Sequence, residues 1–347
     1  MTIDLCKGLA KRFESVEIVV NELVGEFVEE AQKTIRLHSL QTYAWLPALT
    51  GFKRYCRDHK PDIVFAQGTR MSILASLAVL LPGHRPELVW CLHNPYSSKY
   101  SLFPRPIAWL LTRFVALLAS QPARIIGVSN GVCESFLAFA GAKFRRKTLT
   151  LYNPVPQYSG KPFVPSGVKQ KKQIIAVGRL VLQKNFALLI EAMPAVLAQV
   201  DCALHIYGNG PMRQSLQDLI ATKGLEKSIT LEGYASGIRE KMAQSDLFVL
   251  SSSWEGLPMV LLEAMTTGVP VVSTNCVSGP DEILEGGKWG LLVPPDDRLA
   301  LGGAMIKVLK HGGVDPRLRA RDFEPEIVIG KYLALIRTIC GDRTRQN

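Results

Sequence analysis

The 347-residue sequence lacks the patterns that mark disulfide-rich, zinc-binding or membrane-spanning proteins. Its seven cysteines are scattered and none forms a Cys-x-x-Cys pair, so we expect reduced thiols. The longest apolar stretch, 102–120, is interrupted by prolines and arginines, which argues against a bilayer-spanning helix. The start shows no pattern of a secretory leader, so we predict a cytoplasmic protein.

Acidic residues are in short supply relative to basic ones. The chain carries 41 Lys and Arg against 30 Asp and Glu, for a net charge of +11. Residues 1–157 contribute +8 of this charge and residues 158–347 contribute +3. A basic first half favours an anionic partner such as nucleic acid, acidic lipid or a phosphorylated substrate, although solubility alone would also explain it.

Short β-branched runs alternate with helical patterns, which is typical of parallel α/β folds. In the first half, strands are predicted at 16–20, 62–66, 88–92, 124–128 and 148–151, with helices such as 47–59 and 71–80 between them. A Pro- and Gly-rich stretch, 152–172, predicts a linker. Beyond it, strands are predicted at 173–177, 203–207, 228–231, 247–250, 269–273 and 291–293, and helices at 185–199, 212–223, 259–266, 299–309 and 326–339.

This organisation predicts two doubly wound, Rossmann-like domains that face an interdomain cleft, where the carboxyl ends of strands bind ligands. The first domain is predicted at 1–157 and the second at 158–325, with a C-terminal helix and tail, 326–347, that packs back on the first. Residues 1–12 have the apolar pattern of a helix, whereas such folds usually open with a strand and a Gly-rich turn. We therefore expect the first strand and its Gly-rich loop to be missing, through a late start or a true truncation.

The stretch 253–265, SWEGLPMVLLEAM, joins a predicted strand to a predicted helix. Pro258 suits a first helical turn, and the N–H groups there can hold phosphate or sugar oxygens. Gly256 allows close backbone approach. Glu255 precedes the helix and Glu263 lies within it, and a carboxylate accepts hydrogen bonds from sugar hydroxyls. Taken alone, either glutamate is better explained as a surface charge.

Three further loops follow strands of the same half. Arg179 and Lys184 lie after strand 173–177, where they would clamp a diphosphate unless they are ordinary surface cations. The second loop contains Gly208 and Gly210, and glycines there allow a ligand to approach the backbone closely. The third loop is 278–283. We expect all four loops to line one edge of one sheet.

Together these motifs resemble the retaining glycosyltransferases of family 4, which have the GT-B fold. The resemblance is carried, in order, by Gly-Arg-Leu followed by Lys184, the Gly-x-Gly-Pro turn, two glutamates separated by seven residues, and GPDEIL followed by GLLVPPDD. It is strong over about 173–310 and weaker in the first half.

The resemblance implies a role for each matching residue. Arg179 and Lys184 would bind the donor diphosphate, Glu263 the ribose hydroxyls, and Glu255 the donor sugar. His93 matches a family histidine near the reacting carbon, so His93 and Glu255 form the predicted catalytic pair, with a purely structural histidine as the alternative. The full predicted donor-binding set is Arg179, Lys184, Gly208, Gly210, Gly256, Leu257, Pro258, Met259 and Glu263. Such enzymes need no metal or other cofactor, and the sequence has no Asp-x-Asp pair.

The implied activity is transfer of a hexose or N-acetylhexosamine, with retention, from a UDP- or GDP-sugar to a glycan or lipid-linked acceptor. The implied setting is bacterial surface polysaccharide synthesis, with no nucleic acid partner. The stretch 102–120, which combines apolar residues with Arg105 and Arg113, would either dock on an anionic membrane at its inner face or form a buried helix.

Three alternatives remain. The chain could be a truncated, weakly active or non-catalytic protein that binds nucleotide-sugar, or a GT-B sugar epimerase. A hydrolase is suggested by Gly127-Val-Ser-Asn-Gly131, which matches a nucleophile elbow. Ser129 is better explained as the N-cap of the following helix.

Overall fold

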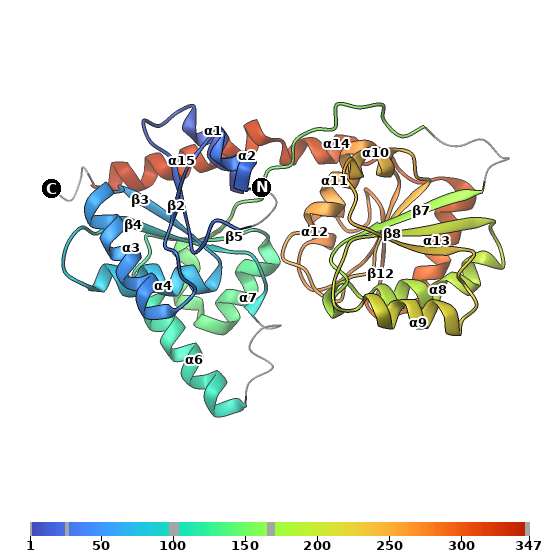
Figure 1. The fold of residues 1–347 in the computed structure, drawn as a ribbon, viewed down its shortest axis with the longest axis horizontal. Helices are drawn as coiled ribbons and strands as arrows, with labels where there is room; N and C mark the ends of the chain where they lie inside the picture. The colour runs from blue at the N-terminus through green and yellow to red at the C-terminus, as the bar shows by residue number, and fades with distance from the viewer. Residues whose placement is uncertain (1, 25–27, 97–103, 165–170, 344–347) are drawn as a thin grey trace. The chain divides into compact units, whose positions relative to one another are not determined.

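The computed structural model describes residues 2–24, 28–96, 104–164 and 171–343, and the chain divides into two compact units (Figure 1). Unit 1 comprises Met1–Pro154 and Pro325–Asn347, and unit 2 comprises Val155–Glu324. The chain therefore passes between units twice, close to the predicted boundaries at 157/158 and 325/326. Each unit is built on parallel β-sheet with helices packed against it, as the alternating pattern predicts.

Unit 1 contains two parallel sheets, a pair β1-β2 and a four-stranded sheet of order β3-β4-β5-β6. Its strands are β1 (Glu17–Val20), β2 (Arg36–Ser39), β3 (Ile63–Gln67), β4 (Glu87–Leu92), β5 (Arg124–Gly127) and β6 (Thr148–Thr150). Its helices are α1 (Thr2–Ala10), α2 (Val28–Gln32), α3 (Trp45–His59), α4 (Gly68–Leu80), α6 (Arg105–Leu118), α7 (Asn130–Ala140) and α15 (Pro325–Arg343), with a 3-10 turn at Ala142–Lys147. Strand β2 and helix α2 were not predicted, because their sequences are mainly polar and show no apolar run or period.

The core of unit 1 joins the two ends of the chain. Helices α1 and α15 lie side by side (Figure 1) and bury apolar side chains against β4 and β5. The shared cluster contains Leu5 and Leu9 of α1, Val89 and Ile126 of the sheet, and Val328, Tyr332, Leu335, Ile336 and Ile339 of α15. Residues that follow unit 2 in sequence thus complete the core of unit 1.

Unit 2 is a single six-stranded parallel sheet of order β12-β11-β10-β7-β8-β9. Its strands are β7 (Lys172–Val177), β8 (Cys202–Tyr207), β9 (Ile229–Gly233), β10 (Leu247–Leu250), β11 (Val271–Thr274) and β12 (Leu291–Val293). Its helices are α8 (Phe186–Leu197), α9 (Arg213–Thr222), α10 (Ile238–Ala243), α11 (Met259–Thr267), α12 (Pro280–Leu284), α13 (Arg298–His311) and α14 (Arg317–Ala320), with 3-10 turns at Leu182–Lys184 and Arg321–Phe323.

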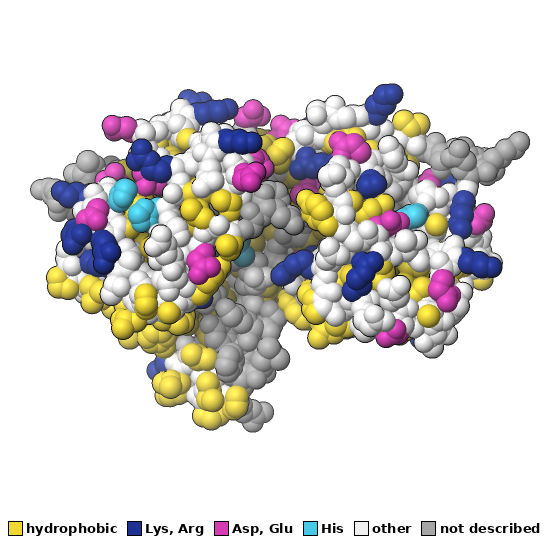
Figure 2. All heavy atoms as spheres, viewed as in Figure 1, with side chains coloured by type: hydrophobic (Ala, Val, Ile, Leu, Met, Phe, Trp, Pro, Cys, Tyr) yellow, Lys and Arg dark blue, Asp and Glu magenta, His cyan; other side chains and the backbone are white. Residues whose placement is uncertain are grey.

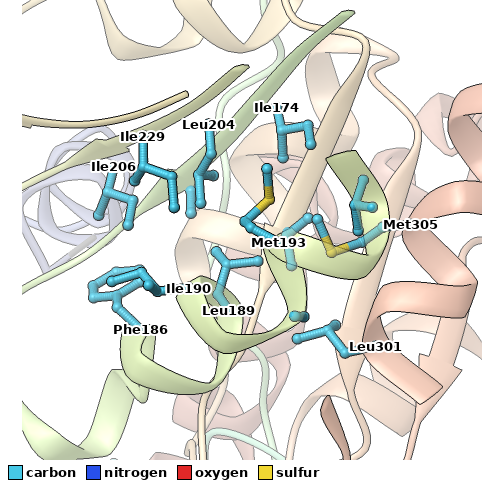
Figure 3. Close-up of a cluster of buried hydrophobic side chains, with 14 of the residues drawn as sticks. Ile174, Phe186, Leu189, Ile190, Met193, Leu204, Ile206, Ile229, Leu301 and Met305 are labelled. Atoms are coloured by element: carbon cyan, nitrogen blue, oxygen red, sulfur yellow. The ribbon is translucent and has the colours of Figure 1, made fainter. Parts of the chain in front are cut away.

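One face of this sheet carries the core of unit 2. Apolar side chains of β7, β8 and β9 lie against those of α8 and α13 (Figure 3). The strands contribute Ile174, Leu204, Ile206 and Ile229, and the helices contribute Phe186, Leu189, Ile190, Met193, Leu301 and Met305. This packing holds the carboxyl ends of the strands, where the predicted loops begin, on a rigid base.

Two isoleucines of α15 test the packing of that helix in unit 1. Ile336 is buried in the cluster shared with α1, whereas Ile327 is 43% exposed. We expect Ile336→Ala to destabilise unit 1 by about 2–5 kcal/mol, because it leaves a cavity, and Ile327→Ala to cost under about 1 kcal/mol. Hydrogen exchange in peptides from α1 and β4 of the full chain measures both effects, and equal protection in the two variants would contradict this packing.

Candidate functional site

The four loops singled out in the sequence leave the same edge of the unit 2 sheet. They follow β7, β8, β10 and β11, which are adjacent strands in the order β11-β10-β7-β8. All pairings among these strands are parallel, so their carboxyl ends meet at one edge. The predicted convergence of the loops is therefore confirmed.

A nearly buried ion pair joins the loops after β7 and β10. Lys184 Nζ lies 2.6 Å from Glu255 Oε1, and the two side chains are 15% and 8% exposed. The hydroxyl of Ser252 donates a hydrogen bond to the same carboxylate oxygen, at 2.7 Å. The other oxygen, Glu255 Oε2, has no hydrogen-bond partner within the described ranges, so it is available to a hydroxyl of a ligand.

Lys184 is held in place by the residue that follows it. Asn185 adopts the left-handed conformation, with φ of 45°, and its side-chain oxygen caps α8 by accepting a hydrogen bond from Leu188 N. Its amide nitrogen donates to Ser253 Oγ at 3.2 Å and to Asp296 Oδ1 at 2.9 Å. Asn185 and Ser252 were not predicted as site residues, although an Asn before a helix is a known capping signal.

Arg179 differs from Lys184 in its surroundings. It is exposed, and its guanidinium forms no ion pair or hydrogen bond with any residue that the structure describes. The two predicted phosphate-binding cations therefore start from different states. Among the described residues, Arg179 is an unpaired cation that can bind an anion directly, whereas Lys184 is already paired with Glu255.

Packing between two loops requires glycine at positions 208 and 210, which the sequence did not reveal. A Cβ on Gly208, whose φ is +135°, would lie 1.9 Å from the carbonyl oxygen of Gly178, and one on Gly210 would lie 2.4 Å from that of Leu180. Leu180 N also donates to Asn209 O at 2.9 Å. The glycines thus let the loops after β8 and β7 pack backbone to backbone, and close approach by a ligand stays a prediction.

The loop from Gly256 to Met259 leads into α11 and is supported from behind. Leu257 and Pro258 are buried, and α11 begins at Met259 without a side-chain cap. Ser278 Oγ donates to Gly256 O at 3.1 Å, and Gly279, with φ of +97°, passes so close that a Cβ there would lie 2.5 Å from Pro258 Cδ. The loop after β11 therefore braces the loop after β10.

The two remaining acidic and basic candidates lie elsewhere. Glu263 is half-buried just over one turn inside α11. His93 lies in unit 1, directly after β4, and is half-buried. Its Nε2 lies 2.7 Å from Gln67 Oε1, and burial lowers the pKa of the imidazole below its usual value. All the other predicted site residues lie in unit 2.

The hydrolase interpretation of Ser129 is wrong. The side chain is fully buried, and its oxygen caps α7 by accepting a hydrogen bond from Val132 N at 3.2 Å. A nucleophile has to reach its substrate, which a buried cap does not. The predicted capping role is confirmed.

Comparison with known proteins agrees with this geometry. Residues 161–322 match the family model described as glycosyl transferases group 1, and residues 1–156 match the one described as Glycosyltransferase Family 4. The chain belongs to the family 4 glycosyltransferases. The predicted fold class is confirmed with it, because both units are Rossmann-like and the structural relatives are GT-B glycosyltransferases.

Two sequence relatives and one solved structure illustrate the membership of this glycosyltransferase. It is 27% identical to an N-acetylgalactosaminyltransferase of Campylobacter jejuni that acts on a diphospho-undecaprenol-linked sugar, over 90% of this chain and 85% of the relative. It is 34% identical to the amylovoran biosynthesis glycosyltransferase AmsD of Erwinia amylovora, over 67% of this chain and 64% of AmsD. The crystal structure of Anabaena HepE in complex with UDP and glucose superposes with a TM-score of 0.79 at 18% identity, covering 97% of this chain and 95% of that one.

The difference between the two cations predicts different costs of removing them. Lys184→Ala leaves the Glu255 carboxylate nearly buried without its cation, so we expect a loss of about 3 kcal/mol in the stability of unit 2. Arg179→Ala removes no hydrogen bond or ion pair among the described residues and should cost under about 0.5 kcal/mol. Thermal unfolding of the two variants measures the difference.

The control for this comparison is the double variant Lys184→Met/Glu255→Leu. It replaces the pair by apolar groups and should recover most of the stability that Lys184→Ala loses, because no buried charge is left unpaired. Equal stability of Lys184→Ala and Arg179→Ala would contradict the energetic weight of the ion pair.

Proposed function

We propose that this glycosyltransferase moves a hexose or N-acetylhexosamine from a nucleotide-sugar to a glycan or lipid-linked acceptor, with retention of the anomeric configuration. The observation that carries the proposal is the Lys184–Glu255 pair, with one carboxylate oxygen unengaged, at the same sheet edge as the unpaired Arg179. A cation for the diphosphate and an acceptor for sugar hydroxyls are the two things that a nucleotide-sugar needs.

In this proposal the donor occupies the edge formed by the four loops. Arg179 binds the diphosphate directly, and the ammonium group of Lys184, while paired with Glu255, also attracts the diphosphate. Glu255 Oε2 accepts a hydrogen bond from a sugar hydroxyl, the backbone of Gly256 to Met259 contacts the sugar, and Glu263 accepts from the ribose. The HepE structure contains UDP and glucose, which makes a UDP-sugar the first donor to test, with GDP-sugars second.

The proposed reaction breaks the bond between the anomeric carbon and the diphosphate oxygen. The acceptor oxygen forms its new bond to that carbon on the same face, and its proton passes to an oxygen of the leaving diphosphate. Negative charge grows on the leaving group, where Arg179 and Lys184 stabilise it, so the proposal needs no metal or other cofactor. His93 would contact the donor sugar or, through its backbone carbonyl, stabilise positive charge at the reacting carbon.

The proposed acceptor is inferred from the substrates and pathways of two relatives. The Campylobacter enzyme acts on a sugar linked to diphospho-undecaprenol, and AmsD takes part in amylovoran biosynthesis. We therefore propose a lipid-linked acceptor in surface polysaccharide assembly. An active enzyme of this kind is distinguished from a non-catalytic binder by turnover, and from an epimerase by transfer to an acceptor.

Turnover of a UDP-sugar tests the role of Arg179. We expect Arg179→Ala to lower kcat by about 10²–10³-fold while the chain stays folded, because it removes stabilisation of charge that develops on the leaving group. Lys223→Ala, an exposed cation between α9 and β9 at the opposite edge of the sheet, should leave kcat unchanged. Undiminished turnover in Arg179→Ala would contradict the role assigned to Arg179. A coupling constant of the product's anomeric proton that shows the configuration opposite to the donor's would contradict retention alone.

Helix α6 supports a peripheral contact with an anionic membrane. Hydrophobic side chains gather along α6 where it projects from unit 1 (Figure 2), and they include the exposed Ile107, Trp109, Leu110, Phe114 and Leu117. The guanidinium of Arg113 lies over the Trp109 ring, 5.0 Å from its centre, and α6 contains no acidic residue. An apolar face with a cation and a tryptophan suits the boundary between headgroups and acyl chains.

The apolar surface continues beyond α6. Helix α4 packs against α6, and an apolar hollow between α3 and α4 is lined by Trp45, Leu46, Leu49, Leu74 and Leu77. Within the described ranges, no helix has both the length and the apolar character needed to cross a bilayer.

Sedimentation with vesicles that contain anionic lipid tests this contact. Leu110 and Leu318 are both 62% exposed, the first on α6 and the second on α14 of unit 2. We expect Leu110→Glu to weaken vesicle binding by about tenfold or more, through lost apolar burial and charge repulsion, and Leu318→Glu to leave it unchanged. Absence of wild-type binding at low salt, or equal loss in both variants, would count against the membrane surface.

A further inference from the structure

Gln67 and His93 lie at the carboxyl ends of neighbouring strands in unit 1. Gln67 is the last residue of β3 and pairs in register with Cys91 of β4. His93 follows β4 directly. The parallel pairing thus brings the amide of Gln67 beside the imidazole, and the distance from Gln67 Oε1 to His93 Nε2 is 2.7 Å.

The amide of Gln67 turns its oxygen, Oε1, toward the imidazole. The thiol of Cys91, which pairs in register with Gln67, adds no charge beside this contact. Burial raises the pKa of that thiol to about 12, so the sulfur stays protonated.

This orientation determines where the imidazole carries its proton. An amide oxygen only accepts hydrogen bonds, so His93 Nε2 has to be the donor. Burial lowers the pKa of His93, and no charged side chain contributes to that shift within the described ranges. The ring is therefore neutral at pH 7 and Nδ1 carries no proton. Nδ1 has no hydrogen-bond partner among the residues that the structure describes.

We propose that Gln67 is a positioning residue that holds His93 as the tautomer protonated on Nε2, so that Nδ1 stays free to accept a hydrogen bond from a hydroxyl of the donor sugar. The inference rests on the proposed function for its substrate, since a sugar hydroxyl is the donor that such an acceptor needs. Gln67 acts through His93 and does not itself contact the sugar.

Nitrogen NMR of the full chain labelled at histidine tests the tautomer directly. His93 is assigned by the signal lost in His93→Asn. We expect wild-type His93 to show a protonated Nε2 and an unprotonated Nδ1, and Gln67→Leu to show mixed tautomers. His84, whose Nε2 lies 2.8 Å from the carbonyl oxygen of Pro61, serves as an internal control that should not change. A wild-type proton on Nδ1, or an unchanged tautomer in Gln67→Leu, would overturn the proposal.

Gln67→Glu gives a second readout that a purely structural role would not move. A carboxylate at this distance favours the imidazolium, so the acid limb of kcat/KM should move up by about 1–2 pH units relative to wild type, with less change in activity at pH 8.5. An acid limb that stays in place would contradict the role of Gln67. If wild type neither binds UDP nor transfers sugar, the proposed function fails, and the NMR experiment still decides the tautomer.

Discussion

The ion pair between Lys184 and Glu255 joins two of the loops that form the proposed donor-binding edge. The loops follow β7 and β10, which are neighbours in the sheet, and the pair is nearly buried, so neither charge is fully compensated by water. Ser252 donates a hydrogen bond to the Glu255 carboxylate, and Asn185 links the two loops by donating to Ser253. Because the carboxylate is held through Oε1 alone, its second oxygen is available to a ligand, and a diphosphate would draw on a lysine that is already in position.

The same geometric rule operates in both units. Parallel strands end at a common edge, so residues directly after adjacent strands become neighbours although they are distant in sequence. In unit 2 this rule gathers four loops around Lys184 and Glu255, and in unit 1 it places Gln67 beside His93. Helix α15 stabilises the second arrangement, because it returns from unit 2 and completes the core against β4 and β5.

Unit 1 also carries an exposed apolar surface on α6. Most of the net positive charge lies in residues 1–157, and the apolar face of α6 is exposed in the same part of the chain. A contiguous patch of exposed leucine and tryptophan side chains is unfavourable in water. An excess of basic residues in the same part of the chain is unfavourable because their positive charges repel one another. An anionic leaflet relieves both costs at once, which is consistent with an acceptor that carries a lipid.

Local sequence pattern was sufficient to predict most of the helices and strands of this protein. Periodicity placed β10 and β12 at their bounds and most other elements within about three residues, because strand and helix periods are properties of adjacent residues. It also placed Glu255, Arg179 and Lys184 at one sheet edge and identified Ser129 as a helix cap. It missed β2 (Arg36–Ser39) and α2 (Val28–Gln32), because these segments are mainly polar and show neither an apolar run nor an apolar period.

Contacts between residues that are distant in sequence were decided only by the tertiary structure. Lys184 and Glu255 are 71 positions apart, and nothing local distinguishes the paired lysine from the unpaired Arg179 five residues before it. The sequence also did not show that the missing side chains of Gly208 and Gly210 make room for the backbone of another loop, while close approach by a ligand stays a prediction. Whether α6 was buried or exposed also depended on its neighbours, since an apolar face has the same pattern in a core as on a surface.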